Sequence, residues 1–144
     1  MQSTETHDSV NAMAAAYAQK AVQRARNMRA ELDFSENSLV ELETILDHVA
    51  RDEAARTGED LTEICKTWGS YLGEVVRQRF GCDWSIETYP GKQFATLTLT
   101  VAGNKLFPSM KVHRRIVEGA QDNVWLFYKM VKAKLEAAPG ARVQ

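Results

Sequence analysis

The sequence predicts an α+β domain with about three N-terminal helices, a small antiparallel β-meander of two to three strands, and C-terminal helices packed on one face. Two observations predict this class. Apolar residues recur every three or four positions up to about residue 80 and again after residue 109, which is the spacing of a helix face. Between residues 84 and 101 the spacing changes to two, which is typical of strands with one buried face.

The chain of 144 residues has the length of one domain and shows no internal repeat, linker or change of composition. Residues 1–9 are mostly polar, and residues 137–144 contain a Pro-Gly pair that breaks regular structure. We therefore predict one domain over residues 10–136, with flexible segments at 1–9 and 137–144.

The first predicted helix spans Val10 to about Glu31 and is rich in alanine and other good helix formers. Its larger residues form one stripe at steps of three or four: Val10, Met13, Tyr17, Ala21, Ala25, Met28 and Leu32. The stripe is thin, and it packs either against its own domain or against a second copy in a dimer. On the second alternative, Met13, Tyr17 and Met28 are candidate interface residues.

Two further helices are predicted before the sheet. Ser35 is the expected N-cap of the first, which ends near Gly58, and the next begins at Asp60 or Leu61. Their apolar positions are Leu39, Leu42, Leu46 and Val49, then Leu61, Ile64, Cys65, Trp68, Leu72, Val75 and Val76.

Glycines mark the interior and the end of the third helix. Gly69 and Gly73 lie one turn apart inside it, where a glycine costs about 1 kcal/mol relative to alanine. Close approach of another backbone is the predicted compensation, and approach of a ligand is the alternative. Gly81 is the expected C-terminal stop.

The meander follows this stop. Trp84, Ile86 and Thr88 alternate with polar residues, and residues 89–92 supply a turn. Residues 95–101 form the clearest strand, with Ala, Leu, Leu and Val on one face and threonines on the other. A short third segment at residues 105–107 ends at Pro108. We expect the threonine face to be solvated and helices to cover the other face.

Two helices are predicted after the sheet. A short one spans Met110 to Val117 and stops at Gly119, and Asp122 caps the last one. The last helix has a seam of Val124, Tyr128, Val131 and Leu135 that is widened by Trp125, Leu126, Phe127 and Met130. Such a helix is usually buried on several sides. If it lies at the surface instead, it is a patch for a partner, and Trp125 joins the candidate interface residues.

Charge is distributed unevenly along the chain, although the net charge is only −1. Residues 31–60 hold ten acidic residues against two arginines, whereas residues 61–144 hold twelve basic residues against seven acidic ones. Two interpretations remain open: an acidic helix packs beside a basic half, or oppositely charged faces dock other molecules.

The densest polar cluster follows the third strand. Its members are Lys105, Lys111, His113, Arg114 and Arg115. Near the start of a helix such residues can bind a phosphate or carboxylate, so they are candidate anion-binding residues. A solvated face, or pairing with the acidic second helix, is the alternative. A pI of about 6.3 and the absence of a recognition helix or an aromatic RNA-binding sheet argue against nucleic-acid binding.

The sequence shows no catalytic or metal-binding signature. His7, His48 and His113 are scattered, and neither GxSxG nor a glycine-rich phosphate loop occurs. We therefore predict no catalytic residue, metal or cofactor. Glu74 and Arg79 flank or enter the apolar stripe of the third helix and are candidate members of a structural ion pair, with Lys111 a conceivable partner of Glu74.

Location is predicted from three features. The two cysteines, Cys65 and Cys82, are sparse and outside any CxxC motif, which fits a reducing compartment. No apolar run approaches the roughly 20 residues of a membrane span, and the first residues do not resemble a signal peptide. We expect a cytoplasmic protein without membrane contact.

A set of short motifs over residues 35–135 resembles a family of uncharacterised bacterial domains. The matching residues are Tyr71-Leu72-Gly73-Glu74, Arg77, Gly81, Trp84, Pro108, Lys111, Gly119 and Phe127-Tyr128. The resemblance implies a bacterial origin and a single α+β fold, and it carries over no substrate or catalytic residue.

Two functions are compatible with the sequence. The first is a non-enzymatic interaction or regulatory module that binds a protein partner or itself, with the acidic segment 31–60 docking a basic target. The alternative is a small-ligand or anion-binding domain, with or without enzymatic activity, that uses the basic cluster between Lys105 and Arg115.

Overall fold

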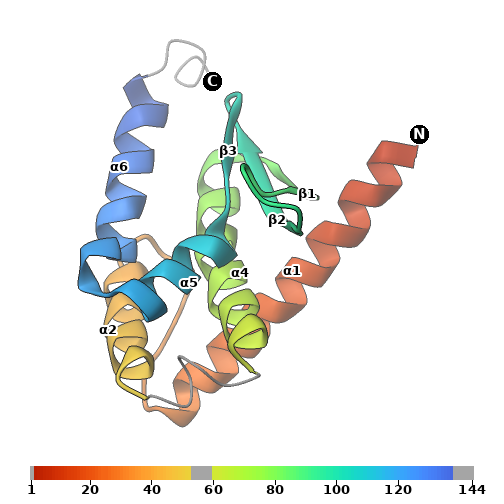
Figure 1. Ribbon diagram of the computed structural model, residues 1–144. Helices are drawn as coiled ribbons and strands as arrows, with labels where there is room; N and C mark the ends of the chain where they lie inside the picture. Colours follow the sequence, from red (N-terminus) through yellow and green to blue (C-terminus); the bar gives the residue numbers. More distant parts are fainter. Residues whose placement is uncertain (1, 53–59, 138–144) are drawn as a thin grey trace.

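The computed structural model describes residues 2–52 and 60–137, and these form an α+β fold with five α-helices and one three-stranded antiparallel sheet (Figure 1). The elements in chain order are α1 (Gln2–Asn27), α2 (Ser38–Ala50), α4 (Leu61–Phe80), β1 (Asp83–Thr88), β2 (Ala95–Val101), β3 (Asn104–Leu106), α5 (Pro108–Glu118), the 3₁₀ turn η1 (Ala120–Asp122) and α6 (Val124–Ala137). The predicted class is confirmed. No helix within the described residues is long and apolar enough to cross a bilayer.

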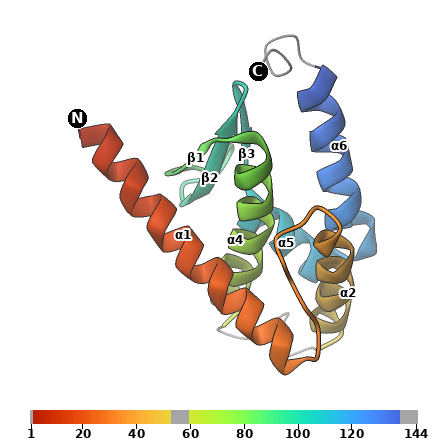
Figure 2. The same cartoon turned by 180° about the vertical axis from the view of Figure 1, so that it is seen from behind.

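Helix α4 is the centre of the fold, with α1 along one side and α5 across the other (Figure 2). Its start at Leu61 and its end before Gly81, which has a φ of 70°, are as predicted. The middle of the helix is buried all round rather than on one face. Thr67, Ser70 and Glu74 are therefore buried together with the apolar stripe.

The two glycines of α4 allow its neighbours to approach closely. A Cβ at Gly69 would lie 2.5 Å from Cα of Ser109, so the backbone of α5 is the neighbour, as predicted. A Cβ at Gly73 would lie 2.1 Å from the indole ring of Trp84. The second neighbour is thus a buried side chain rather than a backbone.

Helix α1 packs on α4 and β1 through small residues, which corrects the predicted stripe. Its buried face is Val10, Ala14, Ala18, Ala21, Val22 and Ala25. Met13 and Tyr17 flank this face and are half-buried, and Met28 is 38% exposed. Alanine leaves room for the helices to approach closely, so the thin helix packs against its own domain.

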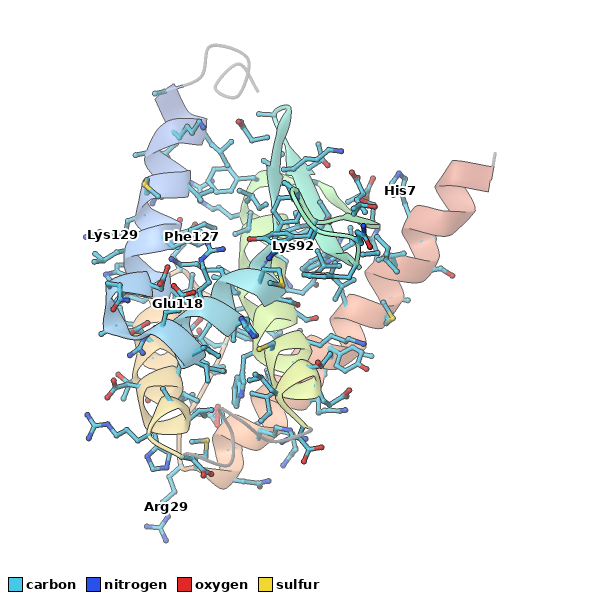
Figure 3. The ribbon with its side chains drawn as sticks, viewed as in Figure 1. His7, Arg29, Lys92, Glu118, Phe127 and Lys129 are labelled. Carbon is cyan, nitrogen blue, oxygen red and sulfur yellow. The ribbon has the colours of Figure 1, made fainter. Side chains whose placement is uncertain are left out.

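Polar side chains of α1 also bond the outer strand of the sheet. Asn11 Oδ1 accepts the N–H of Trp84 at 2.8 Å. His7, which Figure 3 shows between α1 and the sheet, donates from Nδ1 to the Trp84 carbonyl at 3.0 Å. An edge strand otherwise presents such groups unpaired. The helix begins at Gln2, before the start at Val10 that the apolar spacing predicts.

Helix α2 is shorter than predicted. It begins at Ser38, whose N–H donates to Oγ of Ser35 at 3.2 Å, so Ser35 bonds the start of the helix from one turn upstream. It ends at Ala50, and the predicted end at Gly58 lies outside the described residues. Tyr71 of α4 fixes this region, because its hydroxyl accepts the N–H of Phe34 at 2.7 Å.

The sheet is the predicted meander, with strand order β1-β2-β3. Trp84 pairs with Leu99, and Ile86 pairs with Leu97. The threonine face is not wholly solvated, because Thr98 is fully buried while Thr100 is exposed. The hydroxyl of Thr98 donates to the Thr96 carbonyl at 2.9 Å, which satisfies it inside the protein.

Helix α6 is buried along its predicted seam alone: Val124, Tyr128, Val131 and Leu135. Leu126 and Met130 are 57% and 65% exposed, so the predicted burial on several sides is wrong. The reason is the position of α6 at the side of the molecule, where it packs on α2 and α5 through one face (Figure 1).

Candidate functional site

A groove of about 760 Å³ opens between the β1–β2 hairpin and the helices α1, α4 and α5. Each element contributes to its lining: Met13 from α1; Thr62, Cys65 and Lys66 from α4; Ile86, Tyr89, Lys92, Phe94, Ala95, Thr96 and Leu97 from the hairpin; and Ser109, Met110, His113, Arg114 and Glu118 from α5. In Figure 3 the groove-lining Lys92 lies where the sheet meets α5. Volumes of 300–1,000 Å³ are usual for small-ligand sites.

The lining is mainly apolar, and part of it is open to solvent. Leu97 is buried at 4% exposure, whereas Ile86 is 52% and Phe94 is 45% exposed. Ile86 stands opposite Leu97 in the sheet register, so the apolar face of the sheet continues from the core into the groove. An apolar ligand portion would remove these side chains from water.

Tyr89 ties the hairpin to α5 and holds one wall in place. Its ring stacks on Phe94 with 5.7 Å between centroids and meets Phe107 edge-on at 5.1 Å. Arg114 Nη1 donates to the Tyr89 hydroxyl at 2.9 Å. The wall is thus formed before any ligand binds, which lowers the entropic cost of binding.

The titratable nitrogen-bearing side chains of the groove outnumber its carboxylates. Lys66, Lys92, His113 and Arg114 line it, and Glu118 is the one acid among the described lining residues. Lys66 lies over the ring of Tyr17, with its Nζ 5.4 Å from the centroid. The groove therefore combines an apolar floor with a positive rim.

The predicted basic cluster is divided between two places. His113 and Arg114 line the groove. Lys105, Lys111 and Arg114 line a second, smaller pocket of about 100 Å³ beside Phe107 and Phe127, where Lys105 bonds Glu87 and Lys111 bonds Asp122 at 3.1 Å. Arg115 follows Arg114 by about 100° around the helix axis, so it lies on a different face of α5, and this face is buried.

Arg115 pairs with the acidic second helix, which was the alternative interpretation of the cluster. Its side chain is 2% exposed; Nε donates to Glu43 at 2.7 Å and Nη2 donates to Asp47 at 2.9 Å. The other oxygen of Glu43 accepts the N–H of Val124, the first residue of α6, at 2.9 Å. This network joins α2, α5 and α6.

Glu36, another acid of the segment 31–60, also bonds groups of its own fold. Glu36 accepts from the hydroxyl of Tyr128, from Lys132 at 3.0 Å and from Arg79 at 3.3 Å. The Tyr128 hydroxyl, followed by Lys132, holds the pKa of Glu36 below its ordinary value. Glu36, Glu43 and Asp47 are thus paired within the fold, which weakens the argument that the segment docks a basic target.

Glu74 and Arg79 belong to different ion pairs. Glu74 is buried and accepts from Arg77 Nε and from Trp84 Nε1, each at 2.7 Å. Lys111, the conceivable partner, bonds Asp122 instead. Arg79 is 46% exposed and lies outside the stripe, where it bonds Glu36 and Glu136.

The candidate interface residues do not form one surface. Met13 lines the groove and Tyr17 is half-buried nearby, whereas Trp125 stacks on Tyr128 in α6 at 6.3 Å. Helices α1 and α6 lie on opposite sides of the molecule (Figures 1 and 2). A single interface cannot include Met28 and Trp125 together with the groove.

Cys65 lines the groove but is a poor nucleophile. Burial raises the pKa of its thiol to about 12, so the reactive thiolate is scarce at neutral pH. In the described part of the chain, no group of three or more His, Cys, Asp or Glu side chains is placed to hold a metal ion.

The residues that sequence reasoning missed are Lys66, Tyr89, Lys92 and Phe94, together with the exposure of Ile86. One signal was present: the hairpin loop carries two aromatic residues where turn residues are usually small and polar. No pattern in the neighbouring sequence indicated that Lys66 of α4 lines the same groove as the hairpin residues.

Comparison of the chain with family models, curated proteins and solved structures gave no significant match. The resemblance to a bacterial domain family therefore stays a prediction.

Proposed function

We propose that this protein is a non-enzymatic binding module whose ligand places an apolar group in the groove between the β1–β2 hairpin and helices α1, α4 and α5. The observation that carries the proposal is the open apolar lining, in which Ile86 and Phe94 are about half exposed beside the buried Leu97. Two members of the predicted basic cluster, His113 and Arg114, line the groove. The proposal therefore corresponds to the small-ligand alternative of the sequence analysis, with the ligand placed in this groove.

Filling the groove should weaken the binding of an apolar probe. Ala95 is exposed at the start of β2 and lines the groove, so Ala95→Trp puts an indole into it without touching the core. We expect the affinity for the uncharged dye N-phenyl-1-naphthylamine, measured by fluorescence titration, to fall about tenfold or more, which is about 1.4 kcal/mol.

Thr100→Trp is the matched control, because it adds the same ring to the same strand on the opposite, exposed face. It should leave the titration unchanged. Equal binding to the wild type and Ala95→Trp, or no binding to the wild type, would contradict the proposal.

The outer face of α6 favours a second candidate, an interaction with another protein. Leu126 and Met130 are one turn apart on α6 and both more than half exposed. We take a second copy of the chain as the occupant to test. Light scattering should show a dimer that Leu126→Glu/Met130→Glu converts to a monomer, and a monomeric wild type at high concentration would exclude self-association.

We also propose a cytoplasmic location and no nucleic-acid partner. Cys65 and Cys82 are both free thiols, which is the usual state in a reducing compartment. The residues of the predicted basic cluster are divided between the groove, a second small pocket and the buried ion pairs of Arg115, whereas a nucleic-acid site needs basic residues along one continuous surface.

A further inference from the structure

We propose that the groove takes a small amphipathic anion: an aliphatic or aromatic group joined to a carboxylate, sulfonate or phosphate. The inference rests on the proposed function, because the groove must first hold the apolar part. It adds a charge to the ligand and assigns the residues that recognise this charge.

The charge of the groove supports an anion. Its described lining contains two lysines, an arginine and a histidine against one carboxylate. Lys66 and Lys92 take part in none of the ion pairs that join described residues, although the charge of Lys66 also acts on Glu63, which pairs with Lys20. Arg114 is shared between Asp122, at 3.5 Å, and the Tyr89 hydroxyl. The two lysines are therefore the groups that can pair with a ligand.

The shape of the groove supports a small molecule. The β1–β2 hairpin and helices α1, α4 and α5 border an open groove of about 760 Å³, whose lining surface is mainly apolar and carries polar side chains from several of these elements. This is the composition of sites that bury most of a small ligand, with the polar groups setting its orientation. The lysines lie on different elements, α4 and the hairpin loop, so an anion between them would be held from two sides.

A pair of dyes that differ only by an anionic group tests the inference. The dyes are 1-anilinonaphthalene-8-sulfonate and N-phenyl-1-naphthylamine, its uncharged parent, each titrated into the full chain at low salt. In Lys66→Gln/Lys92→Gln we expect the affinity for the sulfonate to fall about three- to tenfold, since each exposed charge contributes up to about 1 kcal/mol. The affinity for the uncharged dye should stay the same.

The matched control is Lys129→Gln/Lys134→Gln, which removes the same charge from exposed positions of α6 that do not line the groove. Lys129 is labelled in Figure 3. It should leave both affinities unchanged. An equal loss in the control would show that only the overall charge matters and would overturn the inference.

The two proposals fail in different ways. If the uncharged dye binds but the groove lysines do not affect the sulfonate, the inference is wrong and the binding groove stands. If neither dye binds, the proposed function fails and the inference fails with it. Circular dichroism of each variant checks that the protein is folded under the conditions of the titration.

Discussion

Arg115→Met should destabilise the protein by about 3 kcal/mol in urea unfolding, because breaking a buried ion pair typically costs 3–5 kcal/mol. The guanidinium is 2% exposed and bonds Glu43 and Asp47 of α2. Methionine fills a similar volume, so the loss comes mainly from the charge and its hydrogen bonds. Because Asp47 is 44% exposed and can be solvated, we place the value at the lower end of the range.

The Arg115→Met substitution affects Glu43 more than Asp47, because the Glu43 side chain is only 15% exposed. Among the described donors, only the N–H of Val124 would still bond Glu43. Glu43→Gln removes the charge and keeps an oxygen for this N–H. The double variant Arg115→Met/Glu43→Gln should therefore recover part of the lost stability.

Arg51→Met is the matched control, because Arg51 also bonds Asp47 but is 78% exposed. Exposed ion pairs contribute little, so the urea midpoint should not change measurably. If Arg115→Met and Arg51→Met behaved alike, the joint between α2, α5 and α6 would not depend on the buried cation.

Sequence patterns predicted the features that depend on near neighbours in the chain. The start of α4 at Leu61, its stop at Gly81 and the alternation through β2 each need only a few residues, and the structure has them. The pairing of the basic segment with the acidic helix was one of two alternatives. Which basic residue pairs depends on the face of α5 on which it lies. Arg115 faces α2, whereas His113 faces the groove.

The groove could not be predicted, because it depends on where four elements stop covering one another. Ile86 has the spacing of a core residue, yet it lines the open groove and is 52% exposed. Likewise, the larger residues of α1 suggested one face, but α4 selected the alanine face because it permits closer packing. Both errors concern packing between elements that are distant in sequence.

Gly73→Ala should destabilise the protein by about 2–3 kcal/mol, as overpacking of a dense core does. Helix propensity alone predicts the opposite sign, since alanine is favoured over glycine by about 1 kcal/mol inside a helix. The new Cβ would lie 2.1 Å from the indole of Trp84, which is fully buried. The ring cannot move away without breaking its bond to the buried Glu74, at 2.7 Å.

A double-mutant cycle with Trp84→Phe identifies the cause. Phenylalanine lacks the outer ring atoms, Cζ2 and Cη2, that the new methyl group would meet. Trp84→Phe is itself destabilising, because Glu74 loses a donor, but Gly73→Ala should cost less in this background, with a coupling of about 1–2 kcal/mol. Urea unfolding of the four proteins measures this coupling. An equal cost in both backgrounds, or a stabilised Gly73→Ala, would show that Trp84 is not the reason for glycine at position 73.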